Sequence, residues 1–391
     1  MSDKHINKKE QLIDPSLEKS SEELKKEKDS SKEKVYGVKE PEKKEKKKDG
    51  VRKPIKWIFI SIIAAAIVLG CAIVLPLALS GADKDAVIKV PKNASIVDVR
   101  DSIAKYLGKD YADKTVKSLK MFGFMDRNRH GAYLISKGTS PFIAGRRMSR
   151  GAQHGVKFVV NGQRTKEDLA KLIANTFDIT EEDMLEAFND SVELNKHGTD
   201  PNKVIGYFLN NTYELYWNTT PDELLRRMRK EYRRFWNNER VEKAEKLRLT
   251  PREIGIIASI TDEETNAQEE KGRIGRLYVN RLNIDMPLQS CPTVKYALKN
   301  FALRRLSNED TRVQSPYNTY IHKGLPPGPI RTPDPRTIDL ILNSEPSKDL
   351  YMCADTDSAN IGRHRFASDY ATHQRNAEIV HKSLNQRGIY H

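Results

Sequence analysis

The sequence of 391 residues is poor in cysteine and in aromatic residues, and it lacks several common catalytic motifs. Its three cysteines (Cys71, Cys291 and Cys353) are too few for a disulfide scaffold or a four-thiolate zinc site. It contains no P-loop, no dinucleotide-type glycine fingerprint and no HExxH sequence, which argues against nucleotide-dependent and zinc-protease chemistry. No cluster of histidine, cysteine and acidic residues has metal-ligand spacing, so we expect no metal and no cofactor.

Charged residues are abundant and unevenly distributed. Lysine plus arginine number 68 and aspartate plus glutamate 54, which gives a net charge of +14. Residues 1–56 contain 18 basic and 13 acidic residues and almost no large apolar ones. Such a segment cannot bury enough surface to offset its ordering entropy, so we expect residues 1–56 to be a disordered tail.

Residues 57–79 form a run of 23 residues without a charge. At about 1.5 Å per residue, a helix of this length spans a hydrocarbon core of roughly 30 Å. The alternatives are a cleaved signal peptide or a lipoprotein cleavage box that ends at Cys71. The leader of more than fifty polar residues and the eight apolar residues after Cys71 favour a permanent transmembrane helix.

The flanking charges predict the orientation of this helix. Residues 39–56 contribute nine basic residues and residues 80–85 contribute one, so we expect the N-terminus in the cytoplasm. The protein is then a single-pass protein of the cell membrane. Everything after residue 79 lies in the periplasm or wall space, which favours a substrate from the cell envelope.

Residues 85–165 have the pattern of a small α+β unit. Residues 86–90, 131–135 and 155–160 alternate like strands, and Ser95 and Thr165 begin helices with an acid three residues later. This pattern is compatible with a LysM-like glycan-binding module, although many small α+β units share it. We expect the second domain, residues 166–391, to be mainly helical, so the fold class is α+β.

A basic helix follows Thr220, where a cap, a proline and an acid mark a helix start. Its arginines and lysine surround apolar and aromatic residues at three- and four-residue spacing. Basic residues interleaved with aromatics can indicate nucleic-acid binding. An amphipathic helix with buried aromatics explains the same pattern, and outside the cytoplasm it is the favoured interpretation. We therefore expect no nucleic-acid partner.

A helix that starts at Thr250 carries three consecutive acids, Asp262, Glu263 and Glu264. At about 100° per residue, the isoleucines of this helix point to about 270°, Glu264 to about 280° and Asp262 to about 80°. The wheel therefore predicts that only Glu264 points into the protein. Apolar surroundings desolvate a carboxyl group and favour its protonated form, the state that a general acid needs. Alternatively, Glu264 lies past the last ordered turn or is neutralised by an arginine such as Arg281.

Several segments resemble the endolytic lytic transglycosylases, the MltG or YceG-like family. The similarity starts from the stretch Ala258–Thr265 around the three acids. It extends over roughly residues 85–385 and includes residues 131–133, 211–214, 276–282, 286–290, 292–294, 315–320, 324–330, His364, Phe366, His373 and Asn376. At residue 291 the family commonly has aspartate, so any role of that aspartate is lost or replaced at Cys291.

The resemblance implies a membrane-anchored enzyme that cuts peptidoglycan strands internally, between N-acetylmuramic acid and N-acetylglucosamine. By matching to the family signature, the catalytic residue is Glu264. A lytic transglycosylase is a lyase: the C6 hydroxyl of the muramyl residue attacks, a 1,6-anhydro end forms, and no water is consumed. One carboxyl group can serve as acid and then as base, whereas hydrolases need two. Such an enzyme acts in cell-wall assembly and strand termination.

Other residues have less specific roles. Asn280, Gln289, Tyr317 and Asn318 are candidates for glycan binding, and the alternative is that their hydrogen bonds hold loops together. His364 could line the cleft, although a structural role is favoured. Cys291 and Cys353 could form a disulfide, which the sequence leaves open.

Two other functions compete with the transglycosylase. The first is a non-catalytic peptidoglycan-binding scaffold of the growth or division machinery. The second is a hydrolase that uses Glu264 and Asp262. Expected partners are glycan strands, the membrane through one helix, and peptidoglycan synthases or elongation and division proteins.

Overall fold

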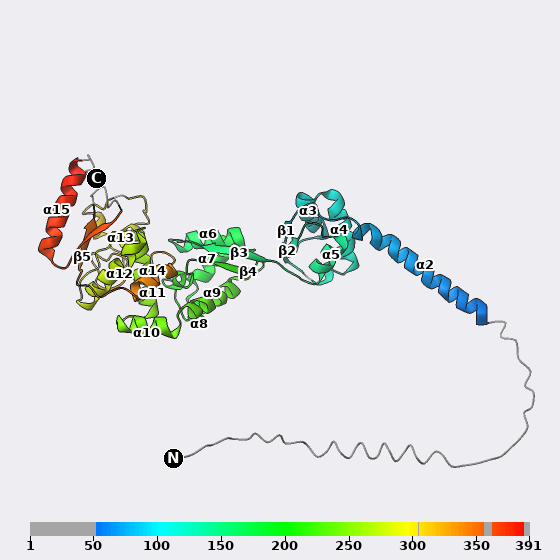
Figure 1. The fold of residues 1–391 in the computed structure, drawn as a ribbon, viewed down its shortest axis with the longest axis horizontal. Coiled ribbons are helices and arrows are strands. Elements are labelled where there is room, and N and C mark those ends of the chain that lie inside the picture. Colours follow the sequence, from blue (N-terminus) through cyan, green and yellow to red (C-terminus); the bar gives the residue numbers. More distant parts are fainter. Residues whose placement is uncertain (1–51, 128, 304, 356–361, 387–391) are drawn as a thin grey trace, which may run out of the picture. The chain divides into compact units, whose positions relative to one another are not determined.

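The computed structural model describes residues 52–127, 129–303, 305–355 and 362–386 (Figure 1). The predicted disordered tail therefore lies outside the described residues, apart from its last five positions. The chain divides into two units, residues 1–68 and 69–391. Helix α2 (Arg52–Ala78) contains the predicted apolar run. Its stretch Lys56–Ala78 is long and apolar enough to cross a membrane, and nearly all of it is exposed, with Leu77 in the last turn the one buried residue.

The first part of the second unit is a two-stranded antiparallel ladder covered by helices. Strand β1 (Ala86–Val90) pairs with β2 (Gly131–Ile135), and both are predicted strands. The predicted capping box at Ser95 is confirmed, because its side chain accepts from Asp98 N and the Asp98 carboxylate accepts from Ser95 N. The other elements of this part are α3 (Ile96–Leu107), α4 (Lys109–Met121), α5 (Pro141–Ser149) and the 3₁₀ helix η2 (Met125–Arg127).

The middle part is built on a second ladder. Strand β3 (Gly155–Val160) pairs antiparallel with β4 (Asn211–Tyr216), some fifty residues later in the chain. We expected β3 in the small unit that ends at residue 165, whereas the structure pairs it with the following part. Its helices are α6 (Lys166–Thr176), α7 (Glu181–Asn189), α8 (Ser191–Lys196), α9 (Pro221–Phe235) and the 3₁₀ helix η3 (Val204–Tyr207).

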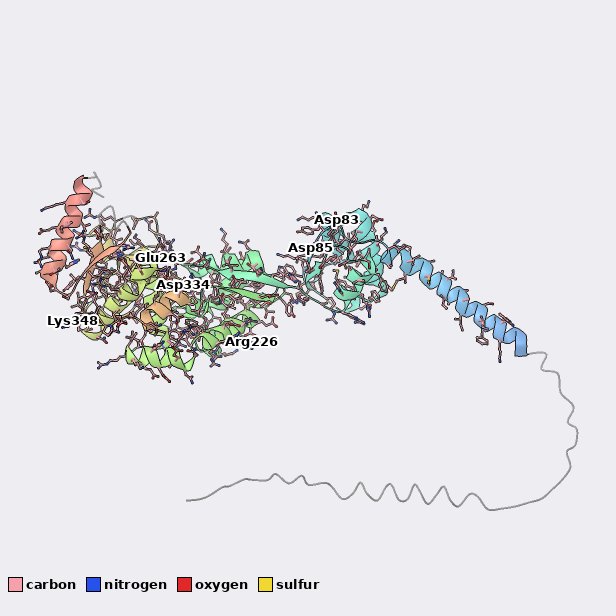
Figure 2. All side chains as sticks on the ribbon, viewed as in Figure 1. Asp83, Asp85, Arg226, Glu263, Asp334 and Lys348 are labelled. Carbon is pink, nitrogen blue, oxygen red and sulfur yellow. The ribbon has the colours of Figure 1, made fainter. Side chains whose placement is uncertain are left out.

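The last part is mainly helical, as predicted, and the α+β class is confirmed (Figure 2). Helix α11 (Pro251–Glu264) contributes Ile254, Ile257 and Ile260 to its apolar core. The remaining elements are α10 (Asn238–Lys246), α12 (Gln268–Asn283), α13 (Cys291–Ala297), η4 (Asp310–Arg312), α14 (Pro335–Leu342), the antiparallel pair β5 (Tyr351–Ala354) and β6 (His364–Ala367), and α15 (Tyr370–Gln386).

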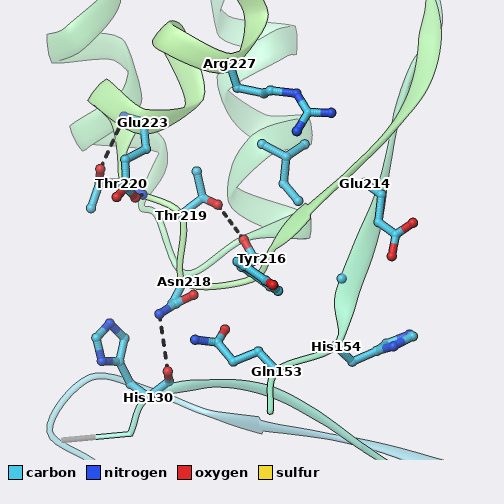
Figure 3. A pocket seen from close by; sticks show the side chains of 12 residues that line it. His130, Gln153, His154, Glu214, Tyr216, Asn218, Thr219, Thr220, Glu223 and Arg227 are labelled. Atoms are coloured by element: carbon cyan, nitrogen blue, oxygen red, sulfur yellow. Dashed lines mark hydrogen bonds between the residues drawn. The ribbon is translucent and has the colours of Figure 1, made fainter. Parts of the chain in front are cut away.

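A cavity of about 940 Å³ is lined by residues from 153–155, the end of β4 and the first turns of α9 (Figure 3). Much of its polar lining already makes local bonds. Asn218 Nδ2 donates to the His130 carbonyl at 3.3 Å, and Thr219 Oγ1 donates to the Tyr216 carbonyl at 2.6 Å. None of the residues predicted to act on a glycan lines this cavity.

Candidate active site

Helix α11 holds the three consecutive acids, and its start is set by the predicted capping box. Thr250 Oγ1 accepts from Glu253 N at 3.4 Å, and Glu253 Oε2 accepts from Thr250 N at 2.7 Å. Every residue from 254 to 262 is buried. Four helices pack against α11, namely α10, α12, α13 and α14. Helix α11 is therefore enclosed on every side.

This enclosure overturns the prediction that only Glu264 points into the protein. Asp262 is 6% exposed and Glu264 is half-buried, so Asp262 is the more buried of the two. The side chain of Glu263 is 13% exposed. A helical wheel identifies an inward face only when one side of a helix meets solvent, and α11 has no such side over most of its length.

Glu264 is the last residue of α11, and one of its carboxylate oxygens is held by two hydroxyl groups. Tyr278 Oη and Ser290 Oγ each donate to Glu264 Oε1 at 2.6 Å. Both donors are buried, with 1% exposure each. Burial raises the pKa of Tyr278 well above its usual value, and the nearby Glu264 charge adds to the effect. Within the described residues, the other oxygen, Oε2, accepts no hydrogen bond.

The loop that carries Ser290 is fixed to a second loop. Ser290 N donates to Thr319 Oγ1 and Gln289 N donates to the Thr319 carbonyl, both at 3.0 Å. Cys291 Sγ and Tyr320 Oη are 3.3 Å apart. The Gln289 side chain is exposed directly beside Ser290, so it is the one predicted glycan-binding residue that combines exposure with this position.

Asn318 is fully buried, which contradicts its predicted contact with substrate. Its Nδ2 donates to the carbonyls of Thr311 at 3.0 Å and Val313 at 2.9 Å, so it holds its own loop together. Tyr317 is half-buried, and its ring centroid lies 4.7 Å from that of Tyr296. Burial raises the pKa of Tyr317 above its ordinary range.

Asn280 is also used structurally. Its Nδ2 donates to the carbonyls of Ser347 at 2.9 Å and Asp349 at 3.0 Å. The amide thus fixes the segment before β5, which is the loop-holding role that the sequence left as the alternative.

Arg281 does not pair directly with Glu264. Its guanidinium donates to the carbonyls of Leu350 and Leu288, both at 2.6 Å. Burial lowers the pKa of Arg281. The predicted alternative, in which this arginine neutralises Glu264 through an ion pair, does not apply to the described structure.

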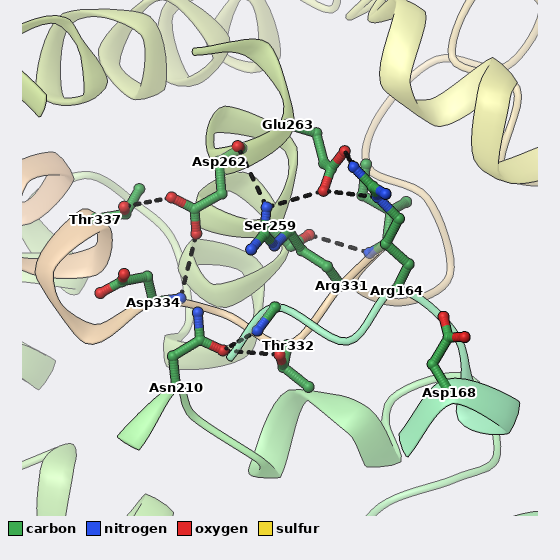
Figure 4. Close-up of polar contacts among 12 residues, drawn as sticks. Arg164, Asp168, Asn210, Ser259, Asp262, Glu263, Arg331, Thr332, Asp334 and Thr337 are labelled. Carbon is green, nitrogen blue, oxygen red and sulfur yellow. Dashed lines mark hydrogen bonds and ion pairs between the residues drawn. The ribbon is translucent and has the colours of Figure 1, made fainter. Parts of the chain in front are cut away.

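Asp262 forms a buried ion pair with Lys271, and Figure 4 shows its contacts with Thr337 and the Asp334 backbone. Its Oδ1 lies 2.7 Å from Lys271 Nζ, and both side chains are nearly inaccessible, at 3% and 7% exposure. Thr337 Oγ1 donates to the same oxygen at 2.5 Å, and Asp334 N donates to Oδ2 at 3.2 Å. These contacts connect α11 to α12 and α14, so Asp262 is a structural residue.

Glu263 pairs with two arginines (Figure 4). Arg164 NH2 lies 2.8 Å from Glu263 Oε2, and Arg331 NH1 lies 2.9 Å from Oε1. Arg164 precedes α6, so the pair joins the middle part of the fold to the end of α11.

The three cysteines are free thiols in the structure, so no disulfide joins Cys291 to Cys353. His364 Nδ1 lies 3.0 Å from Glu270 Oε2, and the His364 backbone N–H donates to Oε1 of the same carboxylate at 3.0 Å. This contact fits the structural role that we favoured for His364.

Among the described residues, one group has ligand atoms close enough to hold a metal: Glu193, His197 and Asp222. The carboxylates also pair with cations, at 2.5 Å from Lys196 to Glu193 and 2.7 Å from Arg226 to Asp222. A metal would therefore compete with two salt bridges, and the predicted absence of a metal stays a prediction.

The sequence interpretation missed Tyr278 and Ser290, although α12 carries a usable signal. Its buried residues Ile274, Leu277, Tyr278 and Arg281 recur at three- and four-residue spacing. This stripe predicts that Tyr278 faces α11. Ser290 has no such periodic signal, because it lies in a loop.

The YceG-like family model matches residues 88–379 of the chain. The endolytic murein transglycosylase of Streptococcus pneumoniae is 34% identical over 189 residues, which are 46% of this chain and 33% of the relative. The endolytic murein transglycosylase of Bacillus subtilis is 30% identical over 142 residues, 36% of this chain and 38% of the relative. The chain thus spans about a third of the length of these curated relatives. A crystal structure of a YceG-like protein from Listeria monocytogenes is 22% identical and covers 75% of this chain and 98% of its own, with a TM-score of 0.49.

Proposed function

The chain belongs to the YceG-like family, and from this premise we propose that it is a membrane-anchored endolytic murein transglycosylase. Its substrate is then the glycan strand of peptidoglycan, cut at the bond from N-acetylmuramic acid to N-acetylglucosamine. The products carry 1,6-anhydromuramyl ends.

The observation that carries this proposal is the asymmetric setting of Glu264. Buried hydroxyl groups hold Oε1, while Oε2 accepts no hydrogen bond from the described residues. The exposed Gln289 lies beside one of the two donors. A general acid must be fixed in position and must keep one oxygen available to the atom that it protonates.

The surrounding acids favour a transglycosylase over a hydrolase. A hydrolytic glycosidase needs a second carboxylate, as nucleophile or to activate water. Asp262 is buried against Lys271, and Glu263 lies between two arginines, so neither is available for that role. Glu264 alone suffices if the substrate supplies its own nucleophile.

In the proposed mechanism, Glu264 first protonates the leaving glycosidic oxygen. The resulting carboxylate then accepts the proton of the C6 hydroxyl as that oxygen attacks the anomeric carbon of the same muramyl residue. Proton transfer of this kind contributes about 10²–10⁴-fold to a rate. Positioning of the glycan and stabilisation of the oxocarbenium-like charge supply the rest.

Mass spectrometry of peptidoglycan digested by the purified chain tests the reaction. Transglycosylation yields 1,6-anhydro ends, hydrolysis yields reducing ends, and a non-catalytic scaffold yields neither. Reducing ends alone, or intact strands, would contradict the proposal.

The first part of the second unit is proposed to bind glycan as a LysM-like module. The element order of strand, two helices and strand, from β1 to β2, supports this assignment. Pull-down with insoluble peptidoglycan tests it.

Removing either hydroxyl donor to Glu264 is expected to slow catalysis without weakening substrate binding. Tyr278→Phe and Ser290→Ala each delete one hydrogen bond to Oε1. A hydrogen bond to a charged group contributes about 1.5–3 kcal/mol, so we expect kcat to fall by roughly tenfold or more in each variant. KM should be nearly unchanged, because neither group faces the substrate. Steady-state kinetics on a defined glycan measure both.

Tyr213→Phe is the matched control, because the Tyr213 hydroxyl is also buried but donates to the Leu209 carbonyl at 2.7 Å. It should lower stability to a similar degree and leave kcat unchanged. An equal loss of kcat in Tyr278→Phe and Tyr213→Phe would show that the effect comes from stability alone.

Helix α2 is proposed to span the cell membrane with the N-terminus in the cytoplasm. Nine basic residues precede it within residues 39–56, and one follows it within residues 80–85. A reporter inserted before Lys56 should be cytoplasmic, and one inserted after Leu79 should be external. A mature protein that lacks the apolar run would contradict the anchor.

A further inference from the structure

Helix α5 presents a basic face to solvent. Its exposed residues recur at three- and four-residue spacing: Ile143, Arg146, Arg147 and the C-cap residue Arg150. Ile143 is 44% exposed. The opposite side of the helix packs into the core through Ala144, Gly145 and Met148. Helix α5 contains no acidic residue, and none of the three arginines forms an ion pair with any described residue.

The neighbouring end of α4 adds apolar and basic side chains. The rings of Phe122 and Phe142 meet edge to face with centroids 5.3 Å apart, which joins the end of α4 to the start of α5. Met121 is 46% exposed and Met125 is 43% exposed. Lys120 is exposed as well. We call the combined surface the basic apolar face: Lys120, Met121, Met125, Ile143, Arg146, Arg147 and Arg150.

The chain itself keeps this face close to the end of α2. Helix α2 ends at Ala78, and four residues later Ala82 N donates to the Thr139 carbonyl at 3.0 Å while Gly138 N donates to the Ala82 carbonyl at 2.8 Å. Ala82 is 5% exposed and belongs to the apolar core of this part. A β-carbon on Gly81 would lie 3.0 Å from the Gly138 carbonyl oxygen, so the two segments are in direct contact.

This attachment limits the distance between α5 and a membrane that α2 spans. Four residues extend by at most about 14 Å. Ser140, the N-cap of α5, follows Thr139 directly. The first turn of α5 must therefore lie near the outer surface of the bilayer.

We propose that the basic apolar face binds the membrane surface, with its arginines on anionic lipid headgroups and Ile143 and the methionines at the interface. A surface that combines cations with apolar side chains is typical of interfacial binding to anionic lipid. An anionic wall polymer would use the charges but not the apolar side chains. The proposal rests on the anchoring by α2 and is independent of the reaction at Glu264.

Hydrogen–deuterium exchange of the full chain in two kinds of vesicle tests this proposal. One vesicle is phosphatidylcholine alone, and the other contains about 30% phosphatidylglycerol. We expect the amides of residues 142–150 to exchange about tenfold more slowly in the anionic vesicles, and about 1 M NaCl to remove most of the difference. The triple variant Arg146→Glu/Arg147→Glu/Arg150→Glu should show no difference between the vesicles.

A variant with the same change of charge on α9 is the matched control. Lys230, Arg233 and Arg234 are exposed and form no ion pair with any described residue. Lys230→Glu/Arg233→Glu/Arg234→Glu should keep the slow exchange of residues 142–150 in anionic vesicles. If it abolished the effect equally, net charge rather than the basic apolar face would be responsible, and the proposal would fail.

Three further outcomes overturn the proposal. Equal exchange in both vesicles shows that the face does not contact anionic lipid. Slower exchange on addition of a soluble anionic polymer, with no effect of phosphatidylglycerol, assigns the face to the wall polymer. If the chain does not float with either vesicle, the membrane anchor and this proposal are both wrong. The formation of 1,6-anhydro ends tests the reaction at Glu264 separately.

Discussion

Glu264→Gln is expected to lower the formation of 1,6-anhydro ends by at least about 10²-fold, the contribution of a positioned general acid. Glutamine keeps the shape of the side chain and can still accept hydrogen bonds from Tyr278 and Ser290 at its carbonyl oxygen. It has no proton to transfer to the leaving oxygen. Glycan binding should persist, so the loss should lie in kcat. Product analysis by mass spectrometry and a binding isotherm measure the two effects.

Stability should change little in this variant. Glu264 forms no ion pair with the described residues, and the buried Arg281, on which its charge acts without a direct contact, keeps its hydrogen bonds to the carbonyls of Leu350 and Leu288. Circular dichroism must accompany the assay, because an unfolded variant would also be inactive. Glu239→Gln, on the exposed side of α10, is the matched control and should retain full activity. Near-normal cleavage by a folded Glu264→Gln variant would refute the assignment of the catalytic residue.

The features that the sequence predicted well are local ones. The capping boxes at Thr165, Thr220 and Thr250 need only a hydroxyl and an acid three residues apart, and all three are present. The strands at residues 86–90 and 131–135 follow from alternation over five residues. Each of these signals lies within a single element.

The features that the sequence did not predict depend on distant contacts. The partner of β3 lies some fifty residues later, and no local pattern identifies it. The wheel of α11 gave the wrong burial for Asp262 because the helix is covered on all sides. Its partner, Lys271, lies on α12, so the ion pair depends on how two helices pack.

The candidate site shows the same division. The family resemblance made Glu264 the candidate catalytic residue, but the residues that hold its carboxylate were not predicted. Asn280 was a candidate for either glycan binding or holding a loop, and it bonds the loop before β5, whereas Tyr278, two residues earlier, contacts Glu264. Likewise Ser290, not the adjacent Gln289, donates to the carboxylate. A shift of two residues on a helix turns a side chain by about 200°, so the register of α12 decides which residue takes part.

Asp262→Asn is expected to have the largest effect on stability among single substitutions at the three acids. Asparagine fits the same space, and its one amide oxygen can keep the hydrogen bond from Thr337, but its NH2 group cannot accept the bond from the Asp334 backbone. It removes the negative charge beside Lys271, whose side chain is 7% exposed. Removing one partner of a buried ion pair lowers the free energy of unfolding by about 3–5 kcal/mol, because the remaining charge is uncompensated. Thermal unfolding of the detergent-solubilised chain should show Tm lower by roughly 6–12 °C or more.

Removal of both charges separates this explanation from a simple loss of packing. In Asp262→Asn/Lys271→Met the uncompensated cation is gone and the aliphatic volume is largely kept, so we expect most of the lost stability to return. Arg273→Met is the matched control: Arg273 pairs with Asp349 at 2.6 Å, but its side chain is 53% exposed, so its loss should lower Tm only slightly. If the double variant were as unstable as Asp262→Asn alone, the hydrogen bonds to α14 rather than the ion pair would hold the end of α11. Glu264 sits two residues beyond Asp262, so a variant that restores stability should also restore cleavage.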